Sequence, residues 1–241
     1  MPSFVLNGTA DYLLLVGGAL FAHICYQLSV SVLAYMSAHS LSRRVGTQRL
    51  LALGASYAAG ALAATVLVLT TIVVLTNTSV VSHSEAVRWL TLVIAVVAPM
   101  IGLLTIIVYY RRGEGTRLWL PRTFARYLLE RAQKTRSGVE AFSLGLTTVL
   151  SELPFIAGPL LLVAVAIAQQ PADTWLAYAL LYAIAAALPL VLLTFYLTSG
   201  HSIARMQQWR ENNKLFLQWM SGLMLVALTL YIALLQFGGG I

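Results

Sequence analysis

Residues 145–162 read GLTTVLSELPFIAGPLLL, and this stretch decides the class of the fold. Apart from Glu152 it carries no charged side chain, and it belongs to an apolar run longer than the roughly 20 residues that a helix needs to cross a bilayer. Five similar runs exist, so that the six cover residues 12–36, 50–76, 88–110, 141–168, 175–198 and 215–236. The sequence therefore predicts an all-α integral membrane protein with six transmembrane helices.

The overall composition excludes other classes of protein. Of the 241 residues, 59% are hydrophobic and 10% are charged, against roughly 45–50% and 25% in soluble domains. A soluble globular or disordered chain is therefore excluded. The single cysteine excludes a disulfide scaffold. The apolar runs are continuous, whereas the strands of an outer-membrane barrel alternate apolar and polar residues.

The basic residues predict the orientation of the chain. All of the 15 Lys and Arg residues except Arg88 follow the first, third or fifth run. Basic loops stay in the cytoplasm, so both termini are expected outside a bacterial or archaeal inner membrane. The net charge of +7 is explained by this topology, and no nucleic-acid partner is expected.

The long basic loop at 111–138 divides the single domain, 1–241, into two halves of three spans, at about 12–110 and 140–236. Because three is odd, homologous halves would have opposite orientations. Such inverted repeats build many transporters, with the substrate site at mid-membrane between them. The polar middle of the first run, GGALFAHICYQLSVSVLA at 17–34, corresponds to that of the fourth.

Two shorter patterns predict local packing. In the basic loop, Pro121 suits the first position of a helix that runs to about residue 133. Its apolar and basic faces favour an interfacial helix on the inner leaflet, and the alternative is a gate or hinge between the halves. In the second span, Ser56, Gly60 and Ala64 recur at every fourth position, which allows close helix packing.

Glu152 is the strongest candidate for function. An ionisable residue at mid-membrane costs a few kcal/mol on the lenient insertion scale, and such residues mark ion pathways and proton relays. Pro154 and Pro159 each remove a backbone N–H, and Gly158 adds flexibility. These features predict an unwound segment from Ser151 to Pro159 whose carbonyls and carboxylate bind a cation or substrate. A simple kink with a structural carboxyl group is the alternative.

The first span supplies the other candidates. His23 and Gln27 are four residues apart and share a helix face. His23 is a candidate proton acceptor or partner of Glu152, and the alternative is a hydrogen bond between helices. Cys25 is the redox candidate, although free cysteine in a span usually acts as a small hydrophobe. The spacing of His23, Cys25 and Glu152 demands no metal site, and none is expected.

The segments AFSLGLTTVLSELPFIAGPLLL, LLYAIAAALPLVLLTFYL and WMSGLMLVALTLYIALL resemble the second half of CcdA and the membrane domain of DsbD. These families belong to the broad group that also holds LysE-type exporters. The resemblance implies the six-span fold and mobile, proline-containing helices. In that family two cysteines beside prolines relay reducing equivalents. Cys25 lies near the first cysteine position without flanking prolines, and Phe155 follows Pro154 where the second cysteine would stand.

These observations favour a secondary transporter that exports a small solute or ion, with protons as a candidate coupling ion. The alternatives are a CcdA-like protein of thiol electron transfer or cytochrome c biogenesis, and a non-transporting subunit of a membrane complex. No Walker-type loop or covalent catalytic triad is visible, so neither enzymatic activity nor a cofactor is expected. Besides the lipid bilayer, the candidate partners are a second copy of the chain or a membrane subunit.

Overall fold

The computed structural model describes residues 8–26, 29–42, 46–82, 96–103, 122–199 and 203–238. Over these residues the chain is helical with short connections and contains no strand. Residues 96–103 are helical, and the other helices are α1 (Thr9–Tyr26), α2 (Ser29–Ser42), α3 (Thr47–Ser82), α5 (Arg122–Lys134), α6 (Gly138–Ala168), η1 (Ala172–Thr174), α7 (Trp175–Thr198) and α8 (Ile203–Gly238).

The described helices are compatible with a membrane protein. Four segments are long and apolar enough to cross a bilayer, namely Thr47–Asn77, Gly138–Ala168, Ala172–Thr198 and Leu215–Ile232. A fifth is obtained if α1 and α2, whose axes differ by 43°, count as one broken span. The third expected span, at 88–110, lies mostly outside the described residues. Apolar helices of this length indicate an integral membrane protein.

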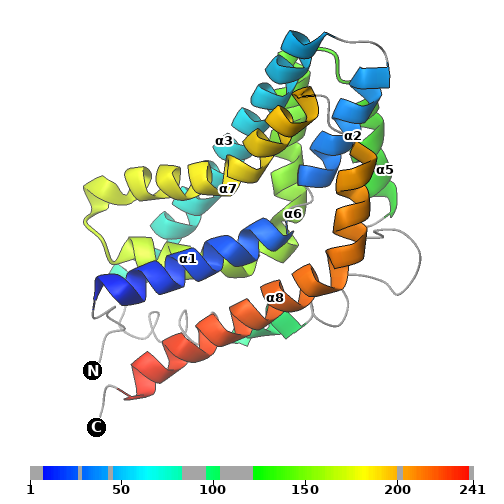
Figure 1. Cartoon of the computed structure of the whole chain (residues 1–241). Helices are drawn as coiled ribbons and strands as arrows, with labels where there is room; N and C mark the ends of the chain where they lie inside the picture. The colour runs from blue at the N-terminus through cyan, green and yellow to red at the C-terminus, as the bar shows by residue number, and fades with distance from the viewer. Residues whose placement is uncertain are drawn as a thin grey trace.

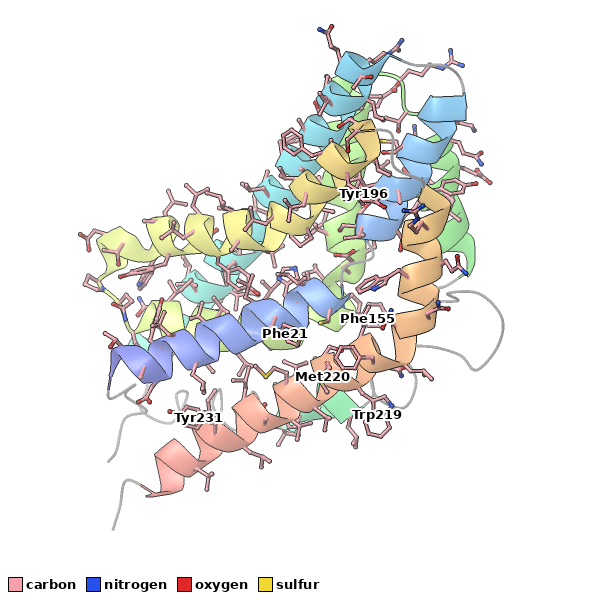
Figure 2. All side chains as sticks on the ribbon, viewed as in Figure 1. Phe21, Phe155, Tyr196, Trp219, Met220 and Tyr231 are labelled. Atoms are coloured by element: carbon pink, nitrogen blue, oxygen red, sulfur yellow. The ribbon has the colours of Figure 1, made fainter. Side chains whose placement is uncertain are left out.

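The helices form an elongated bundle in which α1 lies beside α8 and α3 lies between α6 and α7 (Figure 1). At one end, the Tyr231 hydroxyl of α8 donates a hydrogen bond of 2.6 Å to Asp11 of α1 (Figure 2). At the other end, Arg49 at the start of α3 donates a bond of 2.9 Å to the Arg136 carbonyl just before α6. The starts of α1 and α3 therefore lie at opposite ends of the bundle.

Glycines allow α3 and α6 to pack closely. A Cβ atom at Gly60 would lie 2.0 Å from the Phe142 carbonyl oxygen, and one at Gly145 would lie 2.1 Å from the Tyr57 carbonyl oxygen. A Cβ at Gly138 would lie 3.0 Å from the Ser56 hydroxyl. The prediction of close packing along Ser56 and Gly60 is thus confirmed. Small residues at such contacts let two backbones approach.

The predicted unwinding of residues 151–159 is wrong. Helix α6 runs without interruption from Gly138 to Ala168 with Pro154 and Pro159 inside it. Each proline costs about 3 kcal/mol in a helix interior, but each removes only one N–H from a helix of 31 residues. The many buried side chains of α6 pack against α1 and α3 and hold it in the helical conformation.

Among the described residues, an interruption lies instead between α1 and α2, and their bend fits a broken span or a re-entrant loop. Helix α1 ends at Tyr26 and α2 begins at Ser29 in a new direction (Figure 1). The backbone N–H of Ser29 donates to the Glu152 carboxylate of α6. In a continuous helix this N–H would bond to the carbonyl four residues earlier. The hydrogen bonding therefore agrees with a helix start at Ser29.

The amphipathic helix of the basic loop is present as α5, which begins at Arg122. Its residues Leu128 and Ala132 are buried in the core, and α5 packs against α2 and the start of α6. Gln133 of α5 donates a hydrogen bond of 2.6 Å to the Tyr35 hydroxyl of α2. The apolar face of α5 is thus used at least partly within the protein. Attachment of α5 to the inner leaflet stays a prediction.

Candidate functional site

Glu152 lies near the middle of α6 and is only 1% exposed. The start of α6 is fixed by a capping box, in which the Ser137 hydroxyl accepts from the Glu140 N–H and the Glu140 carboxylate accepts from the Ser137 N–H. This arrangement satisfies two backbone donors at the helix start. The continuous helix then carries Glu152 into the interior of the bundle.

The Glu152 carboxylate is bonded to the first residue of α2. Its Oε1 atom accepts from the Ser29 backbone N–H and from the Ser29 hydroxyl, the latter at 2.9 Å. Ser29 is 1% exposed, so both bonds are buried. The first N–H groups of a helix have no partner within the helix, and the helix dipole favours a negative charge there. Glu152 thus acts as a helix cap supplied by another helix.

A second residue fixes Ser29 from the opposite direction. The Tyr57 hydroxyl of α3 donates a hydrogen bond of 3.0 Å to the Ser29 carbonyl oxygen. Tyr57 is fully buried, and it lies where α3 packs closely on Gly145 of α6. The backbone of Ser29 is therefore held on both its N–H and its carbonyl side by side chains of two long helices.

His23 of α1 is the second titratable group near Glu152. It is 2% exposed, and its Nδ1 atom lies 2.9 Å from the Tyr182 hydroxyl of α7. Tyr182 is also buried. The ring pair therefore connects α1 to α7, as the hydrogen-bonding alternative for His23 predicts. Which atom donates depends on the tautomer of His23.

His23 and Glu152 line one small cavity at the break between α1 and α2. The cavity has room for about one water molecule. Its polar lining comes from four helices, while alanines and larger aliphatic side chains form the rest; the lining residues are His23, Ser29, Ala61, Thr65, Val149, Glu152, Ala186, Ala187 and Leu190. A titratable acid and a titratable base thus line one small cavity among apolar helices.

Several predicted site residues lie elsewhere. The Ser151 hydroxyl donates to the Thr147 and Thr148 carbonyls of its own helix. Pro154 is exposed on the outside of α6, and Pro159 is buried but does not line the cavity. Gly158 packs towards Leu225 of α8. None of these four residues belongs to the cavity around Glu152.

The remaining candidates belong to the first span. Gln27 lies outside the described residues. Cys25 is buried and is the only cysteine of the chain. Among the described residues, no three His, Cys, Asp or Glu side chains gather in an arrangement that could hold a metal ion.

Sequence reasoning did not identify Tyr57, Thr65 and Tyr182 as site residues, and it included Ser29 only as one polar residue in the middle of the first run. A usable signal exists for the two tyrosines, because both lie well inside long apolar helices rather than at the ends. Tyrosine prefers the membrane interface, so an internal, buried tyrosine needs a hydrogen-bond partner. The partner itself depends on how the helices pack.

No family model, curated protein or solved structure matches this chain. The resemblance to CcdA, DsbD and the LysE-type exporters consequently rests on the sequence pattern alone.

Proposed function

We propose that this chain is a secondary transporter of the inner membrane that exports a small solute or ion. In this proposal six spans form two inverted halves, with both termini outside. The close approach of the start of α1 to the end of α8 supports termini on the same side. The basic loops support a cytoplasmic location of the opposite end.

The observation that carries the proposal is the buried bond between Glu152 and the start of α2. A carboxyl group inside a membrane is costly and is retained mainly at functional sites. Here it lies at a discontinuous span, and the half-helix ends of discontinuous spans bind substrates and coupling ions in many transporters. The proposed site therefore lies at the break of the first span rather than within the fourth.

The size of the cavity restricts what can bind there. Room for about one water molecule suits a proton or one small ion. A larger solute requires α1 or α2 to move away from α6. Glu152 would bind the cation or proton, and His23 would complete the polar centre from the opposite wall. Movement at the break would open the site to one side of the membrane.

The proposal is tested by the thermal stability of the purified protein in detergent. Amino acids, divalent cations and thiols are screened across pH with the wild type, Glu152→Gln and Glu130→Gln. A ligand of the folded state raises the melting temperature in a concentration-dependent way. We expect the shift to be lost in Glu152→Gln and kept in Glu130→Gln, because Glu130 is an exposed carboxylate on α5.

Two results would contradict this proposal. One is a ligand shift of equal size in Glu152→Gln and in the wild type, since the site would then lie elsewhere. The other is a shift produced by thiols alone and abolished by Cys25→Ser, which would favour the electron-transfer function. A screen without any shift, in which Glu152→Gln is as stable as the wild type, would favour a non-transporting subunit.

A further inference from the structure

The geometry points to a latch at the break of the first span. The negative charge of Glu152 holds the first turn of α2 against α6, and neutralisation of this carboxylate by a proton releases it. Ser29 is the positioning residue through which α2 responds to that charge, because both of its donors bond to Glu152 Oε1. This inference rests on the proposed function, for which it supplies the link between proton binding and helix movement.

The latch follows from the difference between a charged and a neutral acceptor. Hydrogen bonds to a carboxylate are roughly twice as strong as those between neutral groups. The positive end of the α2 dipole adds a further attraction for negative charge. Both effects are strong in the buried setting of Glu152 and Ser29, where bulk water does not screen them. A protonated carboxyl group loses both effects, because it presents a neutral acceptor oxygen and an O–H donor in place of a charged carboxylate.

Titratable groups of other helices also lie around Glu152. The titratable side chains near it on the described helices are His23 of α1, Tyr57 of α3 and Tyr182 of α7. The residues that line the cavity include no arginine or lysine. The Tyr57 hydroxyl donates to the Ser29 carbonyl oxygen, whereas the Ser29 N–H and the Ser29 hydroxyl both donate to Glu152.

The middle of α2 connects the latch to α5 of the basic loop. Tyr35 of α2 accepts a hydrogen bond from Gln133 of α5, and Leu128 of α5 is buried in the same core. Release of the first turn of α2 therefore changes the support of α5. Because α5 belongs to the basic loop between the two halves, protonation of Glu152 would affect that loop through α2.

Hydrogen exchange of the full-length protein in detergent tests the latch without any transported ligand. Wild type, Glu152→Gln and Glu130→Gln are compared at one pH by mass spectrometry. Glutamine keeps the acceptor oxygen of Glu152 and removes the charge. We expect the amides of the first turn of α2, residues 29–32, to exchange about tenfold faster in Glu152→Gln, the factor that corresponds to 1.4 kcal/mol.

One control region and one control variant provide the comparison within the exchange experiment. The start of α6, capped by Ser137 and Glu140, is expected to exchange at the wild-type rate in all three proteins. Glu130→Gln is expected to leave the first turn of α2 unchanged. Equal exchange of residues 29–32 in Glu152→Gln and the wild type would overturn the latch.

A second variant decides the matter if Glu152→Gln does not fold. Ser29→Ala removes one of the two donors and keeps the carboxylate, so a smaller acceleration in the same turn is expected, and no acceleration would overturn the latch. Ser37→Ala, at another buried serine of α2, is the matched control.

The latch and the proposed function can fail separately. Faster exchange of residues 29–32 in Glu152→Gln, together with a wild type that transports nothing, would support the latch and refute the proposed function. Loss of transport in Glu152→Gln with unchanged exchange would support the proposed function and refute the latch.

Discussion

Glu152 bonds to Ser29 through both the backbone and the side chain of that residue. A carboxylate that accepts two hydrogen bonds at a helix start has two effects that a single bond between neutral side chains of two helices does not have. It replaces the missing backbone carbonyl of the preceding turn, and it places a titratable group where the helix dipole acts on it. A single proton on this side chain therefore alters the stability of a whole helix end.

At this scale the sequence predicted the unusual groups but not their partners. Glu152 and His23 were identifiable because ionisable residues are rare in apolar spans. Ser29 was not, because hydroxyl groups in membrane helices usually bond to their own backbone, as Thr148 does to the Leu144 carbonyl. The bond from Ser29 to Glu152 joins residues 123 positions apart and depends on helix packing.

The buried ring pair gives a prediction at the same scale. Tyr182→Phe removes the hydroxyl that contacts His23 Nδ1 and leaves a buried nitrogen without this partner. We expect the free energy of unfolding to fall by about 1–3 kcal/mol, measured as a lower melting temperature in detergent. Tyr231→Phe removes a hydroxyl from the less buried bond to Asp11 and is expected to have a smaller effect. A larger effect of Tyr231→Phe would argue against the importance of the buried pair.

Among the helices, the expected break within α6 was the main error of prediction, whereas the polar middle of the first run does coincide with an interruption between two helices. Prolines were expected to unwind α6, yet α6 is continuous and the break lies in a span without proline. Propensity describes an isolated helix, whereas the packing of α6 against α1 and α3 offsets the cost of its prolines. A signal for the break did exist, since serine is common at helix starts, but it needed the Glu152 contact to become decisive.

Close packing of α3 on α6 yields a prediction with a matched control. Gly60→Ala places a Cβ atom 2.0 Å from the Phe142 carbonyl, so the two helices must separate. We expect a loss of about 1–3 kcal/mol in the free energy of unfolding. Gly17→Ala, whose Cβ would meet no atom within 4 Å, is expected to be neutral or stabilising by up to about 1 kcal/mol. Equal melting temperatures for the two variants would contradict the packing of α3 on α6.

At the scale of the whole molecule, the composition alone was sufficient to predict the class of the protein, an integral membrane protein. Helices long and apolar enough to span a membrane are present at the second, fourth, fifth and sixth expected positions, and a broken pair is present at the first. The relation between the two halves and the side on which each end lies stay predictions. They depend on the third span, of which only residues 96–103 are described, and on the membrane itself.

The most direct measurement of the proposed function is flux through the protein in proteoliposomes under an imposed pH difference. The probe is the compound that raises the melting temperature most in the ligand screen. Wild type and Glu130→Gln are expected to move it at the same rate, and Glu152→Gln is expected to lose the proton-dependent flux. Proton-dependent flux of equal rate in Glu152→Gln would contradict the role assigned to the buried carboxylate at the start of α2.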